Sequence, residues 1–233
     1  MKTLRLFKDI GHTDLGWLKS GHTFSFASYY DPKWMGFGHL RVINNDRVEG
    51  GGGFAPHSHD NMEIISYVTE GGLAHGDSLG NKSVIPYGSI QLMSAGSGIT
   101  HSEYNDDSVL PVKFYQIWIK PNVRNEAPTY QEKSLFDIDA TNQLVPLVTP
   151  DGRDGTLLIR QDATLSLGRF KAGETLTLPK TDTRDVWVQV VEGQALWEGQ
   201  TLADGDGLGI RDEDEVSISF AKPTELLVFS MGR

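Results

Sequence analysis

The sequence predicts an all-β protein built from two antiparallel barrel-like lobes with little helix. Glycine and proline, 26 and 10 residues of the 233, interrupt the chain about every ten residues. Between them lie short β-forming runs such as MEIISYV, VKFYQIWI and DVWVQVV, which alternate or are wholly apolar and show almost no 3.6-residue periodicity. An apolar strand, a Glu-Gly turn and a second strand also occur twice, as SYVTEGGLAH (66–75) and VQVVEGQALW (188–197), which indicates an internal duplication.

The lobes are expected to divide shortly after residue 120. The segment KPNVRNEAPTYQEKSLFD (120–137) is polar, carries two prolines and follows a strong strand, which is typical of a linker. A chain of 233 residues is long enough for two lobes that each bury a core. We therefore assign residues 1–125 to an N-terminal lobe and 126–233 to a C-terminal lobe.

Composition excludes several classes of function. The net charge of −10 disfavours direct binding to nucleic acid or to an anionic membrane surface. The absence of cysteine excludes disulfides and thiolate metal sites, so a metal would be held by nitrogen and oxygen. No stretch approaches the roughly 18 apolar residues of a membrane span, and the first residues do not resemble a secretory signal. We expect a soluble, cytoplasmic protein.

Two short strands carry residues suited to a metal. His57 and His59 are two positions apart, so on a strand both point to one face, and the same holds for His101 and Glu103 after a glycine-rich turn. Four such side chains on two strands suit the interior of a closed barrel. All seven histidines lie between residues 12 and 101, which predicts that the metal is in the N-terminal lobe.

The C-terminal lobe is expected to lack a metal. Shifting the first histidine pair by the 122-residue offset of the repeat reaches Pro179 and Thr181, neither of which replaces a histidine as a ligand.

Other residues near these strands have simpler interpretations. Glu63 has the same strand parity as His59, so it is either an alternative carboxylate ligand or a buried, hydrogen-bonded acid. The segment TFSF (23–26) is interpreted first as an apolar strand and second as the aromatic border of a pocket. The histidines outside the two pairs are expected to be structural or surface residues, namely His12, His22, His39 and His75.

Specific motifs resemble a known family. The spacing of glycine, histidine and glutamate over residues 51–71 resembles the first cupin motif, and residues 80–88 resemble the opening of the second, although Gln91 replaces the usual histidine. The segments HTFSFASYYDP, MGFGHLRVINNDRV, HSHDNMEIISYV and AGSGITHSEYN together resemble the pirin family, especially its bacterial quercetinase-like members. The resemblance covers roughly residues 10–120 and implies a bicupin whose second lobe has no ligands.

The resemblance implies which residues hold the metal. By motif, the pirin ligands fall on His57, His59, His101 and Glu103, around one divalent ion. The family implies Fe(II) first, and a nitrogen and oxygen ligand set also suits Cu, Ni, Co, Mn or Zn.

Two functions from different classes follow from the resemblance. The first is a quercetin 2,3-dioxygenase-like enzyme, in which a flavonol and dioxygen react with cleavage of the 2,3 bond and release of carbon monoxide, and Glu103 is both ligand and catalytic base. The alternative is a metal- or redox-sensing regulator that binds a partner protein. A flavonol-sized pocket at the metal favours the enzyme, whereas a site sealed by Phe or Trp side chains favours the regulator.

Overall fold

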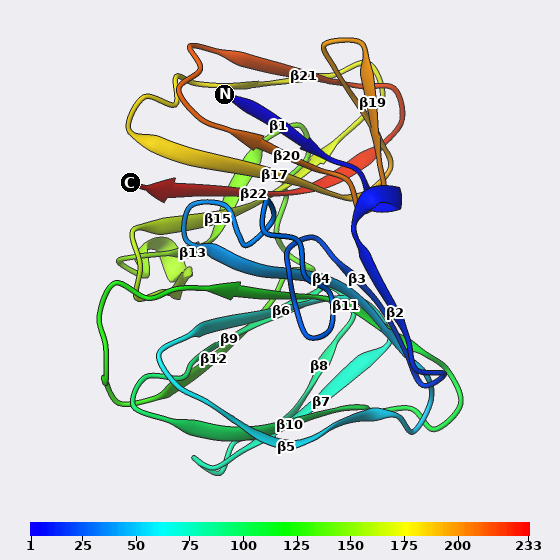
Figure 1. The fold of residues 1–233 in the computed structure, drawn as a ribbon, viewed down its shortest axis with the longest axis vertical. Helices are drawn as coiled ribbons and strands as arrows, with labels where there is room; N and C mark the ends of the chain where they lie inside the picture. Colours follow the sequence, from blue (N-terminus) through cyan, green and yellow to red (C-terminus); the bar gives the residue numbers. More distant parts are fainter. The chain divides into compact units, whose positions relative to one another are not determined.

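A computed structural model describes residues 1–233 and confirms the predicted all-β class. Its helices are two single 3-10 turns, Phe7–Asp9 and Arg153–Gly155, and no helix is long and apolar enough to cross a membrane. The chain forms two compact units (Figure 1). We call residues 11–137 with 159–161 the N-terminal unit, and residues 1–10, 138–158 and 162–233 the C-terminal unit.

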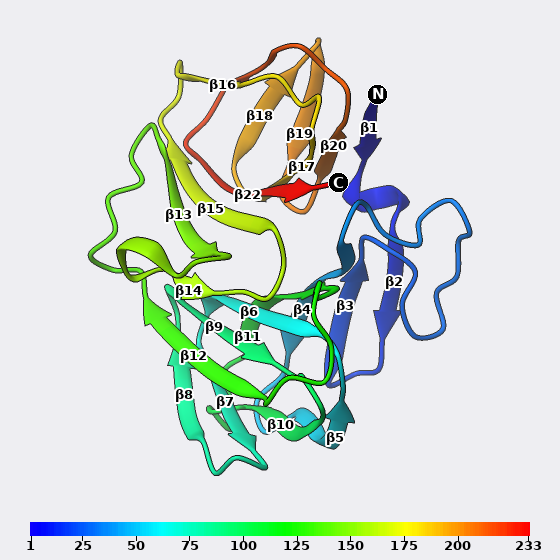
Figure 2. The same ribbon diagram turned by 90° about the vertical axis from the view of Figure 1, so that its left-hand side faces the viewer.

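The N-terminal unit contains a seven-stranded and a four-stranded antiparallel sheet. Figures 1 and 2 show the four-stranded sheet facing the larger one across the interior of this unit. The larger sheet has the order β12 (Thr129–Ser134), β9 (Ser89–Ser94), β6 (Glu63–Glu70), β11 (Val112–Ile119), β4 (Leu40–Val48), β3 (Leu18–His22) and β2 (Gly11–Asp14). The smaller sheet has the order β5 (Gly53–His59), β10 (Ile99–Asn105), β7 (Gly72–Asp77) and β8 (Lys82–Pro86).

The C-terminal unit repeats this arrangement of one seven-stranded and one four-stranded sheet. The larger sheet has the order β1 (Lys2–Arg5), β20 (Gly207–Ile210), β17 (Arg184–Glu192), β22 (Thr224–Gly232), β15 (Ala163–Phe170), β13 (Leu144–Thr149) and β14 (Leu157–Leu158). The smaller sheet has the order β16 (Thr175–Leu178), β21 (Val216–Phe220), β18 (Gln194–Trp197) and β19 (Gln200–Ala203). All its pairs are antiparallel except β13 with β14.

The unit boundaries differ from the expected division at residues 125 and 126. Strand β1 pairs with β20, so the first ten residues belong to the C-terminal unit. Strand β12 pairs with β9, so residues 126–137 stay in the N-terminal unit. Both differences arise because an edge strand joins a sheet through backbone hydrogen bonds, which composition does not reveal.

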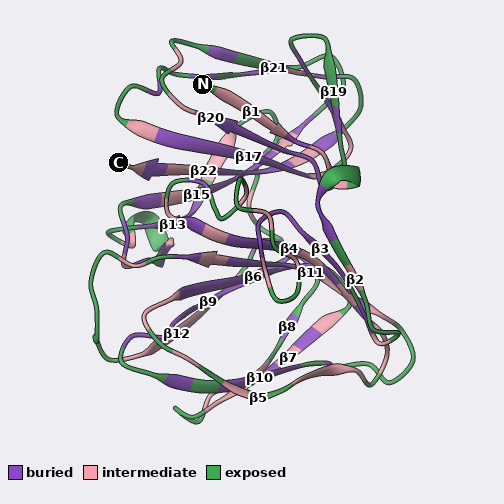
Figure 3. Ribbon diagram, viewed as in Figure 1, coloured by how far each residue is buried: buried purple, intermediate pink, exposed green.

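Buried residues lie on strands of both units, as Figure 3 shows, and apolar clusters fill both interiors. In the N-terminal unit, one cluster includes Phe114 and Leu73 and another includes Ile64 and Met93. The C-terminal unit has one larger cluster, which spans both of its sheets and includes a stacked pair of phenylalanines, Phe170 and Phe220. Burial of these side chains stabilises the units through the hydrophobic effect, without help from a metal.

Candidate metal centre

Strands β5 and β10 carry the two predicted pairs side by side. They pair antiparallel, with His57 opposite His101 and His59 opposite Ile99. Along β10, His101 and Glu103 are buried while their neighbours Thr100 and Tyr104 are exposed, because alternate residues of a strand face opposite sides. The predicted alternation therefore holds on β10.

A glycine turn directs β10 into the interior. Gly96 has a φ of 50°, and a Cβ on it would lie 2.1 Å from the carbonyl oxygen of Glu126. Only glycine satisfies both conditions without displacing the backbone. The glycine-rich turn noted in the sequence is thus what allows the chain to enter β10 where it does.

The three histidines of these strands face one another. Their ring centroids are separated by 4.5 Å for His57 and His101, 4.8 Å for His57 and His59, and 5.0 Å for His59 and His101. One ring nitrogen of each lies within 4.8 Å of the others. Imidazoles that bind one ion at about 2.0–2.1 Å, at near-right angles, have centroids roughly 4.5 Å apart. The spacing therefore suits a shared ion, and their role as ligands stays a prediction.

The ring nitrogens of these histidines are available to a metal. His57 Nδ1 donates a hydrogen bond to the carbonyl oxygen of Ala55 at 2.8 Å, which leaves the lone pair on Nε2. Both ring nitrogens of His101 are buried and have no hydrogen-bond partner in the protein. A buried polar atom without a partner costs about 1–3 kcal/mol, and coordination of an ion would remove that cost. The residues present therefore fit a metal.

Burial keeps His59 and His101 neutral. Desolvation, reinforced by the neighbouring His57, lowers the pKa of His59 to about 4. Desolvation, reinforced by His57, His59 and His75, lowers the pKa of His101 to about 3. At neutral pH both rings are uncharged, which is the form that binds a metal.

Glu103 is buried and held by three neutral donors. Its Oε1 accepts hydrogen bonds from Ser66 Oγ at 3.0 Å and from Gln91 Nε2 at 2.9 Å, and its Oε2 accepts one from Gln116 Nε2 at 2.7 Å. Burial raises the pKa of Glu103, and the hydrogen bonds from Ser66 and Gln116 and the nearby His75 and His57 oppose the rise. Gln91, which stands where cupins usually have a histidine, here orients the carboxylate.

Glu103 groups most closely with a histidine that the sequence analysis set aside. The ligand atoms of His75, His101 and Glu103 lie within 4.8 Å of one another, and Glu103 also lines the same cavity as His57 and His59. His75 is 4% exposed and its ring centroid is 5.5 Å from that of His101. The structure thus places His75 beside Glu103, although in the sequence it lies outside the two pairs.

One feature of the sequence could have drawn attention to His75 as a candidate ligand. It is followed two positions later by Asp77 in the same strand, which is the spacing of the other two pairs. Its place opposite Glu103 depends on the pairing of β7 with β10, which no local pattern reveals.

Glu63 has the second of its two expected roles. It is 1% exposed, does not line the cavity, and accepts hydrogen bonds from Ser94 Oγ at 2.7 Å and the backbone N–H of Arg160 at 3.2 Å. Burial raises its pKa. Glu63 is thus a buried, hydrogen-bonded acid that fixes the residues 159–161 segment to β6.

The remaining histidines fit the structural or surface interpretation. His22 is buried, and its two ring nitrogens contact Thr13 Oγ1 and Asn44 Oδ1, both at 2.9 Å. His12 is exposed and His39 is half-buried, and neither belongs to a group of ligand-type side chains.

A narrow cavity opens onto the histidines. Its volume is about 70 Å³, well below the roughly 300–1,000 Å³ typical of small-molecule sites. Its apolar wall includes Phe26, Phe54 and Trp118, and Trp118 packs edge-on against both Phe26 and His59 at 5.4 and 4.9 Å between ring centroids. The polar lining includes Asp46, whose pKa burial raises to about 7.

The segment TFSF (23–26) has the second of its two expected roles, as an aromatic border of the cavity. The segment TFSF is a loop after β3 rather than a strand, with Phe24 buried and Phe26 lining the cavity. Sequence reasoning missed Asp46 and Trp118, because isolated polar or aromatic residues in strands β4 and β11 carry no distinctive spacing.

Two cupin-like β units, of which one carries nitrogen and oxygen ligands on paired strands, define a bicupin with a candidate metal centre in its N-terminal unit. The chain belongs to the pirin family. The family model described as Pirin matches residues 3–119, and that of the quercetinase C-terminal cupin domain matches residues 146–231. This confirms the resemblance found in the sequence.

Individual relatives match along nearly the whole chain. The chain is 45% identical over 228 residues to quercetin 2,3-dioxygenase of Escherichia coli strain K12, covering 98% of this chain and 97% of the relative. It is 41% identical over 223 residues to a pirin-like protein of Caulobacter vibrioides, covering 95% and 96%. The crystal structure of the bacterial pirin YhhW from Escherichia coli in complex with nickel(II) superposes with a TM-score of 0.94 at 43% identity, covering 100% and 99%.

Proposed function

We propose that this protein is a metal-dependent dioxygenase of the pirin type that cleaves flavonols such as quercetin at the 2,3 bond. Its N-terminal unit would hold one divalent ion through His57, His59, His101 and Glu103, and its C-terminal unit none. The observation that carries the proposal is a set of converging imidazoles, with both nitrogens of His101 unpartnered, beside a buried carboxylate. The nickel(II) complex of a relative and the names of the relatives support it.

The metal would supply a Lewis acid with open coordination positions for a flavonol oxygen and dioxygen. Fe(II) is our first choice, and Cu, Ni, Co, Mn and Zn are alternatives because the ligand set accepts all of them. A cytoplasmic location and the absence of direct nucleic-acid or membrane binding stay predictions from composition.

The protein's own residues would bind and deprotonate the substrate. Glu103 Oε2 accepts one hydrogen bond, from Gln116, and so retains capacity to take the proton of the flavonol 3-hydroxyl. Phe26 and Trp118 would pack against the substrate rings and exclude water from the reacting edge. Because the cavity is about 70 Å³, only the hydroxyl-bearing edge enters it, and the other rings lie outside.

A second candidate is a metal- or redox-sensing regulator that binds a partner protein. The same small cavity with its wall of Phe26, Phe54 and Trp118 favours this alternative, since a site enclosed by aromatic side chains protects an ion better than it admits a three-ring substrate. In that case the ligands would be the same and turnover would be absent.

The test is anaerobic purification with elemental analysis, loading with each divalent metal, and spectra before and after quercetin. For the enzyme we expect a spectral change on adding quercetin without dioxygen, and then equal losses of quercetin and dioxygen with release of carbon monoxide. A metal-loaded sample that consumes neither quercetin nor dioxygen would remove the dioxygenase and leave the regulator.

A further inference from the structure

We propose that His75, His101 and Glu103 form a second, inner position for the metal ion, which adjoins the position proposed above and shares His101 and Glu103 with it. This inference rests on the proposed metal centre for His101 and Glu103 and adds His75 as a ligand. Two residues, His101 and Glu103, serve both positions, and we propose the positions as alternative places for one ion.

The three side chains meet in the interior of the N-terminal unit. His75 on β7 lies directly opposite Glu103 on β10, and the ligand atoms of all three lie within 4.8 Å of one another. Their exposed fractions are 4%, 2% and 2% for His75, His101 and Glu103. Two imidazoles and a carboxylate form a ligand set that suits first-row divalent metals.

His75 has the hydrogen-bonding arrangement of a metal ligand. Its Nε2 lies 3.0 Å from Asp77 Oδ2. Asp77 Oδ1 accepts hydrogen bonds from the backbone N–H groups of Leu79 and Asn81, and Oδ2 accepts a further one from Asn81 Nδ2, so this carboxylate acts as an acceptor toward His75. The proton of His75 therefore lies on Nε2 and the lone pair on Nδ1. A carboxylate that orients a histidine through its other nitrogen is common at metal sites.

The lone pair of His75 has no partner in the protein. Nδ1 is buried and makes no hydrogen bond, as is also true of both nitrogens of His101. The ring cannot easily turn away, because it stacks on Tyr130 with centroids 4.5 Å apart, and the Tyr130 hydroxyl contacts Ser83 Oγ at 2.8 Å. A fixed, buried lone pair beside a carboxylate indicates a place for a cation.

The inner position differs from the outer one in its access to the cavity. His57, His59, His101 and Glu103 line the cavity, whereas His75 does not. An ion held by His75 is thus withdrawn from the entering substrate, and an ion held by His57 and His59 is presented to it. The balance between the two positions would set how much of the bound metal is open to a ligand.

The test uses Co(II) alone as the probe on the full-length protein. Binding is followed by the visible absorption of the bound ion and by elemental analysis, and the ion is located by anomalous scattering from crystals. We compare wild type with a His57→Ala/His59→Ala double variant, the same double variant carrying His75→Gln, and His101→Ala. His22→Gln is the matched control, because His22 is also buried but both its ring nitrogens are paired.

We expect the double variant to retain one Co(II), bound more weakly than in wild type and displaced toward His75. Adding His75→Gln should abolish binding, and His22→Gln should leave it unchanged. Asp77→Asn in the double variant should weaken binding by about 10–100-fold, as is typical when the partner of a metal-bound histidine is lost. Circular dichroism checks that each variant keeps its β structure.

The outcomes separate this inference from the proposed function. Suppose that wild type binds one Co(II) but the double variant binds no more than His101→Ala does. The inner position is then not a site, and the centre under Proposed function stands. If wild type binds no Co(II), both proposals fail.

Discussion

The two units share one arrangement of strands and differ in what they place at equivalent positions. In the N-terminal unit, His57 on β5 pairs with His101 on β10. In the C-terminal unit, Leu178 on β16 pairs with Val216 on β21. The proposed metal ligands of one unit thus correspond to aliphatic residues of the other.

Glu103 and His75 of the proposed inner position also correspond to apolar residues in the C-terminal unit. Asn105 lies opposite Leu73 on β10 and β7, and Phe220 lies opposite Ala195 on the equivalent strands β21 and β18. Two residues away on each strand, Glu103 therefore corresponds to Ile218, and His75 corresponds to Trp197. All four replacements belong to the apolar cluster of the C-terminal unit: Leu178, Val216, Ile218 and Trp197.

Unpaired polar atoms follow the same division. Every buried side-chain nitrogen or oxygen without a hydrogen-bond partner belongs to the N-terminal unit: Asp46 Oδ1, His75 Nδ1, Gln91 Oε1, His101 Nδ1 and Nε2, Trp118 Nε1 and Arg160 Nη1. The C-terminal unit has none. The comparison teaches that this framework can fold around an apolar interior, so the unpaired polar atoms of the other copy cost stability and are not needed for the fold.

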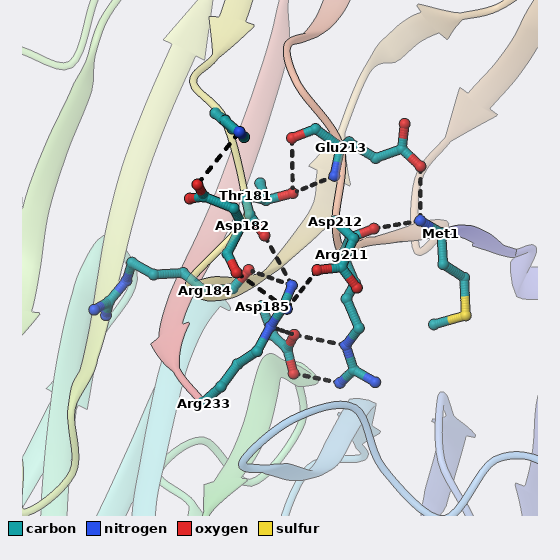
Figure 4. A network of polar contacts seen from close by, with 10 residues as sticks. Met1, Thr181, Asp182, Arg184, Asp185, Arg211, Asp212, Glu213 and Arg233 are labelled. Atoms are coloured by element: carbon teal, nitrogen blue, oxygen red, sulfur yellow. Dashed lines mark hydrogen bonds and ion pairs between the residues drawn. The ribbon is translucent and has the colours of Figure 1, made fainter.

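In the C-terminal unit, the buried carboxylate of Asp185 is paired with arginine side chains. Asp185, with a side chain 5% exposed, contacts both Arg211 and Arg233, and Arg233 also contacts Asp212 (Figure 4). These ion pairs join the start of β17 to the loop after β20 and to the end of the chain.

The largest effect is expected from His101→Ala, which removes a ligand common to both metal positions. Metal content and flavonol oxidation should fall by more than the roughly 100-fold that loss of a supporting residue can cause. The far-ultraviolet circular dichroism should stay β-rich, because apolar burial and not the ion stabilises the unit. Full activity in this variant would show that the site lies elsewhere.

Ile218→Ala, at the position that corresponds to Glu103, is expected to lower stability and to leave metal binding unchanged. Removing a buried aliphatic side chain should lower the free energy of unfolding by about 2–5 kcal/mol, measured by urea denaturation. Metal content per folded molecule should be unchanged. Loss of the metal would contradict the assignment of a ligand-free C-terminal unit.

Asp185→Asn tests the ion pairs through their pH dependence. Burial raises the pKa of Asp185, but its hydrogen bonds and charge interactions with Arg211 and Arg233 outweigh this and leave the pKa below its usual value. Stability from this carboxylate is therefore present above the unfolded pKa of about 3.9 and is lost as pH falls below it. The variant should lose about 1.5–3 kcal/mol at pH 7. Urea denaturation should show the difference from wild type shrinking in acid, and a constant difference would contradict the assignment.

Gln91→Leu tests the support of Glu103. Losing one amide donor should cost about 1–3 kcal/mol and raise the pKa of Glu103 further, because fewer hydrogen bonds then favour its charged form. Metal binding, which needs the carboxylate, should then begin at higher pH than in wild type. Titration of bound Co(II) against pH measures the change, and an unmoved midpoint would argue against Glu103 as a ligand.

The smallest effect is expected from Thr181→Ala. The 122-residue offset places Thr181 at a lost ligand, but strand pairing aligns His57 with Leu178, so Thr181 is not at a ligand position. Its Oγ1 accepts a hydrogen bond from Glu213 N at 2.9 Å, as Figure 4 shows. Thermal denaturation should reveal a loss of about 0.5–1.5 kcal/mol, with metal content unchanged. A loss of metal would place a ligand in the C-terminal unit.

The sequence by itself determined the all-β class, the duplication and the spacing of the two candidate ligand pairs. These properties are local, because the side-chain period of a strand is two residues and a glycine turn is a property of a few adjacent residues. His57 and His59, or His101 and Glu103, share a face wherever their strand lies.

Only the tertiary structure decided which strands meet. The pairing of β7 with β10 brings His75 to Glu103, the pairing of β1 with β20 moves the first residues into the C-terminal unit, and the loop after β3 brings Phe26 to the cavity. Each depends on hydrogen bonds and packing between segments distant in sequence, whose register is set by the whole core rather than by any local pattern.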